Sequence, residues 1–421
     1  MTDRQRIAVV GGGISGLATA WLLSRRHEVH LFEANDYVGG HTNTELIESG
    51  GLSWPVNTGF IVYNDWTYPN FIRLMNELGI DSEASSMSFS VQSPANGLEY
   101  SGTSLNTLFA QRRNIVNPRF LNMIRQIVRF NRLANATLCD GALRDDLTLG
   151  EWLDSCGFSD YFRRHYVIPM GAAIWSSAES DIQCFPARFF LQFFSNHGML
   201  AVHDRPTWRV IKGGSARYVR PMLAPLEGRV YTGIPVTAIR REPDSVSIHS
   251  TRGEENFDQV VIAAHADQAL AMLSDPSDDE RRILGDLPYT ENEVVLHTDT
   301  RLLPRNRRAW AAWNYHLPGD SQQAVSVTYN MNILQNFNNA PDTFCVTLNR
   351  SDAIRPDAIL RRYRYAHPCF TAAGVRAQSC YERIGAHNRT HYCGAYWFNG
   401  FHEDGVRSAM RVAKSLGVDW R

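Results

Sequence analysis

Three glycines near the N-terminus have the spacing that cradles a diphosphate. Gly11, Gly13 and Gly16 follow directly after an apolar, β-branched run from Arg6 to Val10. The first glycine permits a tight turn, the second lets the backbone approach a pyrophosphate, and the third lets a helix pack against the strand. The N-terminus of that helix supplies N–H groups and a positive dipole end. We therefore predict a binding turn for the ADP half of a dinucleotide.

An acidic residue and a second pair of glycines refine the choice of dinucleotide. Glu33 follows a predicted strand at 28–32, where its carboxylate can accept hydrogen bonds from ribose hydroxyls and would repel the 2′-phosphate of NADP. Gly39 and Gly40 complete the pattern E-x5-G-G. Paired glycines at this place let the chain pass close to the pyrophosphate and turn toward a flavin.

The composition of the chain is that of an ordinary globular protein, whose strands and helices must position these residues. Its 421 residues, net charge of -1 and 44% hydrophobic content predict two or three domains and no affinity for nucleic acid. Seven scattered cysteines without C-x-x-C spacing argue against a zinc site and a disulfide scaffold. The N-terminus leaves no room for a signal peptide, and no apolar run reaches the ~20 residues of a membrane span. We expect a cytoplasmic protein that can also rest peripherally on the inner membrane surface.

The stretch from Glu33 to Gly40 resembles the extended dinucleotide signature of the flavin-containing amine oxidase superfamily. Its members include monoamine oxidases, protoporphyrinogen oxidase, phytoene desaturases and flavin-dependent fatty-acid isomerases. Segments 57–60, 235–240 and 400–409 resemble, in the same order, its flavin-side segment, its adenine-binding strand and its last helix. In the family this helix points its positive end at the flavin N1–C2=O edge and stabilises reduced flavin. The resemblance implies FAD as cofactor and these binding residues: Gly11, Gly13, Ile14, Ser15, Gly16, Glu33, Ala34, Gly39, Gly40, His41, Thr42, Thr58, Gly59, Phe60, Val236, Ala263, Gly394, Gly405 and Val406.

The same resemblance implies a fold and a division into domains. The expected fold is α/β, with a Rossmann-type three-layer FAD-binding domain and a discontinuous, mixed α+β substrate domain. The FAD-binding domain is predicted to comprise residues 1–64, 205–290 and 385–421, and the substrate domain residues 65–204 and 291–384. The FAD is expected to lie extended, with its ring between the domains.

Two positions depart from the amine oxidases of the superfamily. Those enzymes carry a lysine that reaches flavin N5 through a water, and Glu293 takes its place here. Tyr396 replaces an acidic residue that binds the ribityl chain, and Phe401 is the one evident half of the aromatic pair that brackets an amine. These departures weaken the amine oxidase interpretation. The catalytic candidates are Phe401, Tyr396, His41 and His402. Either histidine could move a proton, and the alternative for each is a purely structural role.

Segments of the predicted substrate domain point to a lipid. Residues 169–176, 196–200 and 329–335 resemble a narrower bacterial group of predicted NAD/FAD-binding proteins associated with enzymes that modify unsaturated fatty acyl chains. The resemblance implies a fatty acyl substrate. Five phenylalanines between Phe185 and Phe194 suit a helix in a protein core, and they would also suit the wall of an alkyl-chain tunnel.

A basic segment precedes these residues. From Tyr100 to Cys139 the chain contains no Asp or Glu but six arginines: Arg112, Arg113, Arg119, Arg125, Arg129 and Arg132. After Pro118 the apolar residues recur at helical spacing, which predicts an amphipathic helix with arginines on its other face. We hypothesise that Arg112–Arg132 contacts a fatty-acid carboxylate or an anionic membrane surface. The alternative is a solvated face balanced by acidic neighbours in space.

Taken together, these patterns predict an FAD-dependent oxidoreductase of the desaturase type. It would remove a hydride and a proton from an activated carbon of an unsaturated or methyl-branched fatty acyl chain, with flavin N5 as the hydride acceptor. Three alternatives stay open: a fatty-acid double-bond isomerase, a flavin amine oxidase, and a non-catalytic flavoprotein partner of a lipid-modifying enzyme. Neither a metal nor a nucleic acid is expected as a partner.

Overall fold

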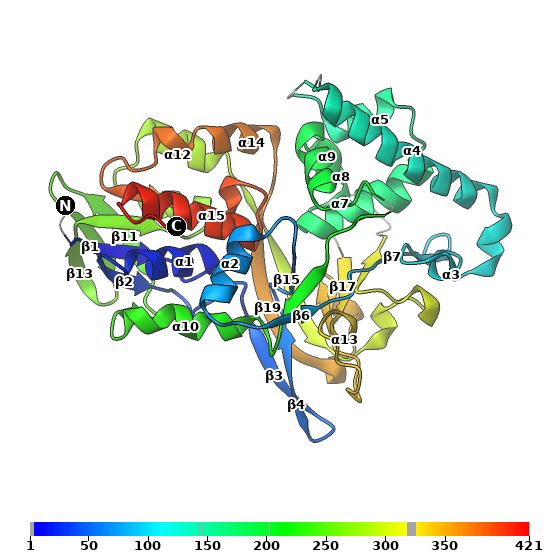
Figure 1. The fold of residues 1–421 in the computed structure, drawn as a ribbon, viewed down its shortest axis with the longest axis horizontal. Coiled ribbons are helices and arrows are strands. Elements are labelled where there is room, and N and C mark those ends of the chain that lie inside the picture. Colours follow the sequence, from blue (N-terminus) through cyan, green and yellow to red (C-terminus); the bar gives the residue numbers. More distant parts are fainter. Residues whose placement is uncertain (1–3, 142, 145, 202, 318–325, 421) are drawn as a thin grey trace.

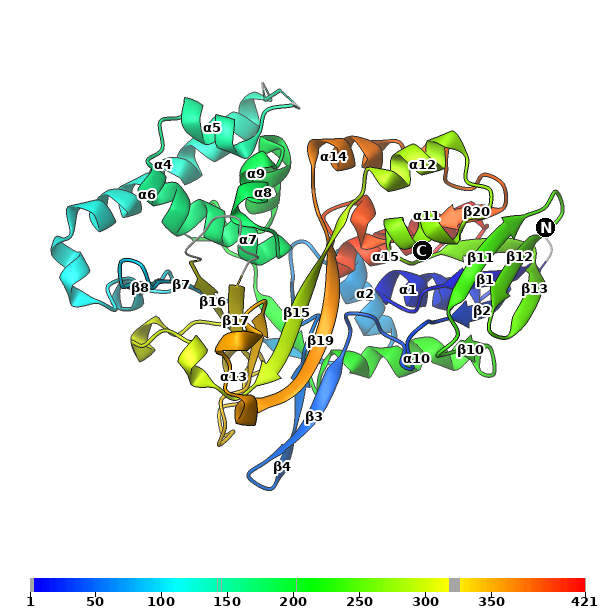
Figure 2. The ribbon, with the colours of Figure 1, turned by 180° about the vertical axis from the view of Figure 1, so that it is seen from behind.

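Two halves of the molecule are joined by two long paired strands, β15 (Tyr289–His297) and β19 (Ile359–Pro368) (Figure 1). The computed structural model describes residues 4–141, 143–144, 146–201, 203–317 and 326–420. One half contains a parallel sheet and both ends of the chain, and the other contains a larger sheet and a group of helices (Figures 1 and 2). The predicted α/β fold class is confirmed.

Five parallel strands form the sheet of the first half, in the order β10–β2–β1–β14–β20. The two strands predicted around the glycine turn occur with the predicted bounds. Parallel neighbours require long crossover connections, so distant parts of the chain meet in one sheet. The strands lie within the ranges predicted for the FAD-binding domain, whose bounds stay a prediction. They are β1 (Arg6–Val10), β2 (Glu28–Phe32), β10 (Val230–Tyr231), β14 (Gln259–Ile262) and β20 (Thr390–Tyr392).

Alternate residues of β1 face two different cores, because successive side chains of a strand point to opposite faces. Ile7 and Val9 pack with helices α1 (Ile14–Leu23), α10 (Val219–Leu223) and α15 (His402–Ser415). Ala8 and Val10 pack with the three-stranded antiparallel sheet β11 (Val236–Arg241), β12 (Val246–Ser250) and β13 (Gly253–Phe257). The resulting three layers direct the N-termini of α1 and α15 to the carboxyl edge of the parallel sheet, where dinucleotides bind in such folds.

The apolar run from Phe257 to Ala264 spans two strands of different sheets. Strand β13 ends at Phe257, and β14 begins at Gln259. Asp258 lies between them, and its carboxylate accepts a hydrogen bond from the Arg6 amide at 2.7 Å. This contact turns the chain from the antiparallel sheet into the parallel one.

The second half is built on a seven-stranded sheet in the order β19–β15–β18–β17–β16–β7–β8. The neighbouring strands of this sheet pair antiparallel, except that β16 pairs parallel with β7. The remaining strands are β7 (Phe89–Ser93), β8 (Leu98–Ser101), β16 (Trp313–His316), β17 (Ser326–Asn330) and β18 (Cys345–Leu348). Its principal helices are α4 (Pro118–Asp140), α5 (Leu149–Ser155), α7 (Ile168–Trp175), α8 (Glu179–Cys184) and α9 (Ala187–Asn196).

Two sequence expectations about these helices are confirmed. Helix α4 starts at Pro118, and the Asn117 side chain caps its first turn. Helix α9 carries most of the phenylalanine stripe, and Phe190 and Phe194 are completely buried in the core of this half. Phe185 lies just before α9 rather than within it.

Smaller elements connect the two halves. They are α2 (Pro69–Glu77), the hairpin β3 (Thr44–Ser49) and β4 (Leu52–Asn57), and a three-stranded sheet of β5 (Val62–Asn64), β9 (Trp208–Ile211) and β6 (Ser82–Ala84). All seven cysteines are free. In the described parts of the chain, no helix has the length and apolar character needed to cross a membrane. The same parts contain no group of three or more His, Cys, Asp or Glu side chains placed to hold a metal ion.

Candidate cofactor and substrate site

The glycine turn lies between β1 and α1, and two of its glycines are sterically required. A Cβ atom on Gly11 would come within 2.7 Å of the Ala263 carbonyl oxygen, and Gly11 has a φ of +106°. A Cβ atom on Gly16 would lie 1.9 Å from the Gly11 carbonyl oxygen. Gly13 is different: its φ is -71°, and a Cβ atom there would meet nothing within 4 Å. The open space beside Gly13 fits the predicted diphosphate.

The first turn of α1 is suited to an anion. Gly13 is the N-cap residue, no side chain caps the helix, and no acidic residue lies in the first turn. The Leu17 amide donates to the Gly13 carbonyl at 2.8 Å. The amides of Ile14, Ser15 and Gly16 therefore have no acceptor within the helix and can donate to a bound diphosphate.

Glu33 faces the same turn from the end of β2. Its carboxylate is only 6% exposed and accepts a hydrogen bond from the Gly12 amide at 2.7 Å. A carboxylate has further acceptor capacity, so ribose hydroxyls can bind beside this contact. The adjacent Ala34 is exposed. The Ile234 amide donates to the Glu33 carbonyl at 2.9 Å, which brings Val236, at the start of β11, to this edge of the sheet.

The glycine doublet lies against the turn, as its pattern predicts. The Gly39 amide donates to the Gly12 carbonyl at 2.9 Å. A Cβ atom on Gly40 would lie 3.2 Å from Gly13 Cα, and Gly40 has a φ of +57°. The backbone after β2 therefore closes over the open side of the glycine turn.

The predicted flavin-side segment packs on the residue after the doublet. A Cβ atom on Gly59 would come within 2.3 Å of the His41 carbonyl oxygen, and the Phe60 amide donates to the same oxygen at 2.7 Å. The Thr58 hydroxyl lies 3.0 Å from the Tyr365 hydroxyl on β19. The His41 ring lies against Tyr365 with 4.7 Å between centroids. Through these contacts, both halves of the molecule meet beside His41.

His402 opens α15 and is held by three neighbours. Its Nε2 lies 3.0 Å from both the Thr42 and the Tyr218 hydroxyl oxygens, which also hydrogen-bond to each other. The ring stacks on Phe60 with 3.5 Å between centroids. Burial lowers the pKa of His402 to about 3, so the ring is neutral near pH 7. Sequence reasoning missed Tyr218, because it lies 176 residues from Thr42 and no local pattern marks it.

The rest of the first turn of α15 packs on the first turn of α1. A Cβ atom on Gly405 would lie 2.8 Å from Ile14 Cγ2 and 2.9 Å from Ser15 Oγ. Val406 is fully buried beside them. The two helix N-termini therefore meet at the carboxyl edge of the sheet, and glycine at position 405 permits this approach.

Gly394 and Tyr396 follow β20 at the same edge. A Cβ atom on Gly394 would lie 2.1 Å from the Tyr396 ring, so only glycine fits beneath this side chain. The Tyr396 hydroxyl is buried and has no hydrogen-bond partner in the described parts of the chain. Buried polar groups nearly always have a partner, so this hydroxyl suits a group that the protein itself does not supply.

Two carboxylates in the first turn of α15 accept hydrogen bonds from backbone amides of the protein. Glu403 accepts hydrogen bonds from the amides of Asn70 (3.1 Å) and Phe71 (2.9 Å), and so caps α2. Asp404 accepts a hydrogen bond from the Phe401 amide at 3.0 Å and lies 3.6 Å from the Arg407 guanidinium. Burial raises the pKa of both groups, and that of Asp404 to about 7.

Aromatic side chains form a wall in front of α15. Phe401 stacks on Phe193 with 5.2 Å between centroids, and Phe189 stacks on Phe370 at 4.9 Å. Sequence reasoning did not single out Phe370. A cavity of about 400 Å³ adjoins Phe401 and extends to the half-exposed Trp66. Polar residues, including His197, Asp404 and Arg407, line it as well.

Glu293 does not take the place predicted for it. Its carboxylate binds Arg362 at 2.8 Å and the Ser351 hydroxyl. Asn292, the preceding residue of β15, is buried and donates to His367 Nδ1 at 3.0 Å. Adjacent residues of a strand face opposite ways, so a one-residue shift of register puts Asn292 toward the site and Glu293 away from it. The prediction for Glu293 was therefore wrong by one residue.

The parallel sheet, glycine turn, acidic residue and glycine doublet define a dinucleotide-binding enzyme of the flavoprotein class. A sequence model of the flavin-containing amine oxidoreductase family matches residues 14–362. The chain belongs to this family and is an FAD-dependent oxidoreductase. The predicted superfamily, cofactor and enzyme class are thus confirmed.

The names of individual relatives within the superfamily indicate different activities. A Mycobacterium tuberculosis protein named as a flavin-containing monoamine oxidase, AofH, is 25% identical over 98% of this chain and 96% of its own length. A zeta-carotene desaturase of Zea mays is 25% identical over 36% of this chain and 29% of its own length. The crystal structure of a fatty acid isomerase from P. acnes has a TM-score of 0.72 at 16% identity, with 99% of this chain and 100% of that chain covered. This last likeness concerns the fold.

Proposed function

We propose that the protein desaturates an unsaturated or methyl-branched fatty acyl chain. The aromatic wall at α15 carries this proposal: Phe189 stacks on Phe370, Phe193 stacks on Phe401, and Phe401 lines the adjoining cavity. The carboxylates nearest to the wall, Glu403 and Asp404, are occupied by backbone amides, as described above. An alkyl chain can therefore lie against rings without leaving a buried charge unpaired. A relative named as a carotenoid desaturase is consistent with a hydrophobic substrate.

The chain's own residues would hold the reactants and exclude water. FAD, when bound, supplies an acceptor for a hydride at N5. The amides of Ile14, Ser15 and Gly16 would hold its diphosphate, and Glu33 its ribose. We assign His402 a positioning role, because its Nε2 contacts the hydroxyls of Thr42, two residues after the doublet, and of Tyr218. Phe401 would orient the acyl chain by ring contact.

Amine oxidation is the second candidate, favoured by the full-length similarity to a protein named as a monoamine oxidase. The residue of β15 that faces the site, Asn292, is uncharged and bound to His367 and Asn349. It offers no cation at the place where amine oxidases of the superfamily carry a lysine. The carboxylates that line the cavity at Phe401, Glu403 and Asp404, accept hydrogen bonds from backbone amides of the protein.

The test is anaerobic reduction of the bound flavin. FAD-loaded protein is mixed with phospholipids that carry unsaturated, methyl-branched or straight saturated chains, and separately with primary amines. We expect the unsaturated or methyl-branched lipids to bleach the flavin absorbance, with one flavin reduced for each double bond formed. Bleaching by an amine but by no lipid class would establish the amine oxidase instead.

Mass spectrometry of the products separates the remaining alternatives. A desaturase lowers the mass of the acyl chain by two hydrogen atoms, whereas an isomerase moves the double bond at constant mass and leaves the flavin oxidised. The variant Phe401→Ser is expected to slow bleaching at least about tenfold, or ~1.4 kcal/mol, with unchanged FAD content. A non-catalytic flavoprotein would show neither bleaching nor a product with any lipid.

We also propose that the arginine-rich segment rests on an anionic membrane. Within the described parts of the chain, none of its six arginines forms an ion pair with a carboxylate, so the alternative of acidic neighbours finds no support. Four large apolar side chains of the same region are exposed: Leu105 (76%), Ile115 (51%), Val116 (81%) and Val128 (59%). Basic residues interleaved with exposed apolar ones are typical of surfaces that bind lipid headgroups and enter the acyl boundary.

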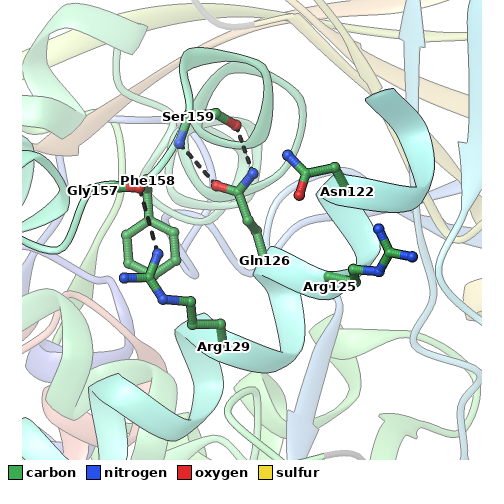
Figure 3. Close-up of a pocket in the computed structure, with 7 residues that line it drawn as sticks. All are labelled: Asn122, Arg125, Gln126, Arg129, Gly157, Phe158 and Ser159. Atoms are coloured by element: carbon green, nitrogen blue, oxygen red, sulfur yellow. Dashed lines mark hydrogen bonds between the residues drawn. The ribbon is translucent and has the colours of Figure 1, made fainter. Parts of the chain in front are cut away.

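A hollow on α4 belongs to this surface (Figure 3). Gln126 and Ser159 exchange two hydrogen bonds of 2.8 Å across it. Arg129 lies over the Phe158 ring and donates to the Cys156 carbonyl at 2.6 Å. Arg125 lines the same hollow and is exposed, so its guanidinium can meet a lipid phosphate (Figure 3).

A further inference from the structure

Arg411, in the second half of α15, holds its guanidinium among aromatic rings. The Cζ atom is 3.2 Å from the ring centroid of Tyr381 and 5.6 Å from that of Trp397. Tyr381 opens η9 (Tyr381–Arg383), and Trp397 ends η10 (Ala395–Trp397). Arg411 comes nine residues after His402. This is about 13 Å along the helix axis, so the place is separate from the first turn of α15.

The guanidinium of Arg411 has N–H groups without an acceptor. Its Nε and Nη2 atoms are buried, and neither has a hydrogen-bond partner in the described parts of the chain. Burial lowers the pKa of Arg411, but a guanidinium stays protonated near neutral pH. Ring faces attract this charge without accepting its hydrogen bonds as an oxygen would. A buried cation that has lost water in this way is costly and calls for a further partner.

Two side chains of η10 carry unpartnered polar atoms beside it. Trp397 Nε1 and the Tyr396 hydroxyl are both buried and lack a partner among the described residues. Trp397 is 2% exposed and Tyr396 3%, and their rings lie 5.1 Å apart between centroids. Burial raises the pKa of Tyr396, whereas the Trp397 N–H and the Arg411 charge oppose this shift, so both lie near the hydroxyl. Three donor side chains from two elements therefore face one small region.

The neighbouring groups of the protein do not fill this region. Glu382, on η9, is the carboxylate whose charge acts on Arg411, but it is exposed and forms no ion pair with Arg411 within the described ranges. The Tyr396 carbonyl oxygen already accepts from the Gln378 side chain at 2.7 Å. Arg407, one turn earlier on α15, has a carboxylate at 3.6 Å. The charge of Arg411 is therefore left for a partner from solution.

We propose that Arg411, Tyr396 and Trp397 form a binding site for a small inorganic anion, chloride or phosphate, between α15, η9 and η10. The guanidinium and indole N–H groups only donate, and the hydroxyl can donate as well. Such a set of donors suits an anion and does not suit a metal ion. Arg411 is partly exposed, so the anion can enter from solvent.

A bound anion would join the second half of α15 to η10. It would bind the folded protein and not the unfolded chain, so it should raise the melting temperature in a saturable manner. The site lies outside both the glycine turn and the aromatic wall. The inference is therefore independent of the proposed desaturase activity.

The experiment measures the melting temperature of FAD-loaded protein in sodium chloride, sodium phosphate and sodium gluconate, at one pH and a constant sodium concentration. We expect chloride or phosphate to raise it by about 3 °C when the anion is at about a hundredfold its Kd. The anion with the lower half-saturating concentration is the occupant. Gluconate is bulky and should give no saturable rise.

The variant Arg411→Met removes the charge, retains an apolar side chain and should lose the saturable rise. Lys414→Met is the matched control, since it removes a charge from an exposed position of the same helix. It should respond to both anions like the parent protein. A general salt effect would instead appear in all three proteins without saturation.

A second variant keeps the test valid if Arg411→Met does not fold. Trp397→Phe retains an aromatic ring but lacks the N–H donor, and it should raise the half-saturating concentration at least about threefold. Far-ultraviolet circular dichroism shows whether each variant folds. The proposal is overturned if neither anion gives the parent protein a saturable rise, or if folded Arg411→Met keeps that rise. An unchanged half-saturating concentration in folded Trp397→Phe also overturns it.

Discussion

At the scale of single residues, Gly13 and Gly16 belong to one pattern but serve different purposes. A methyl group on Gly16 would collide with a backbone oxygen, whereas one on Gly13 would enter open space. We predict that Gly13→Ala folds with nearly the parental melting temperature as apoprotein but binds FAD at least about tenfold more weakly, or ~1.4 kcal/mol. Gly16→Ala should lose the fold itself. Thermal melting and FAD titration of both variants test this, and normal FAD affinity in Gly13→Ala would place the diphosphate elsewhere.

Residues next to the glycine pattern could be predicted from sequence because their roles depend on neighbours along the chain. Glu33 and the glycine doublet fall within thirty residues of the turn, and the structure places them against it. Tyr218 and Phe370 could not be predicted, since each acquires its role from contacts across more than a hundred residues. The error at Glu293 has a related cause: in a strand, a shift of one residue exchanges the two faces.

At the scale of elements, the first turn of α15 contains an acid whose burial makes stability depend on pH. The pKa of Asp404 is about 7 in the folded protein, above its ordinary value of about 4 in an unfolded chain. The folded state holds the proton more tightly, so stability declines as pH rises between these values, by up to about 4 kcal/mol. Asp404→Asn retains an acceptor for the Phe401 amide and removes the titration.

We therefore predict that Asp404→Asn reduces the fall in melting temperature between about pH 5 and about pH 8. Differential scanning calorimetry of the apoprotein measures it. Asp244→Asn, at a fully exposed position, is the control and should leave the fall unchanged. An undiminished fall in Asp404→Asn would show that other groups dominate the pH dependence.

Elements with strong local signals were predicted well. Strands β1 and β2 have the predicted bounds because an apolar β-branched run and a glycine turn delimit them. The break between β13 and β14 could not be foreseen, since it depends on the bond from Arg6 to Asp258 across 252 residues. The last helix begins at His402 rather than Gly400, because Gly400 has a φ of +93° and lies in the turn before Phe401.

At the scale of the whole molecule, the basic and apolar surface on the helical half is remote in the fold from the glycine turn (Figure 1). We predict that Arg125→Gln, Arg129→Gln and Arg132→Gln together weaken binding to vesicles that contain phosphatidylserine, by about 1 kcal/mol for each arginine at the surface. Vesicle co-sedimentation at two salt concentrations measures the loss. Binding of the parent protein should decrease with added salt.

The control for this experiment removes the same charge elsewhere. Arg217→Gln, Arg220→Gln and Arg281→Gln change exposed arginines of the other half and should leave vesicle binding intact. Equal losses from both triple variants would indicate a general charge effect. Substitution of Ile115 and Val116 by serine should reduce binding even to vesicles at high salt, because the apolar contribution is not screened.

The pairing of β20 with β14 and the packing of α15 on α1 have a consequence for biosynthesis. All ten residues of α1 are buried in the finished fold, partly by α15, which is translated long after α1. At roughly 5–20 residues per second, the interval between emergence of Phe32 and of Thr390 from the ribosome is on the order of 20–70 s. During that time the apolar side chains of α1 remain exposed to solvent in the nascent chain. We therefore expect the cofactor site to be complete only after α15 has been translated.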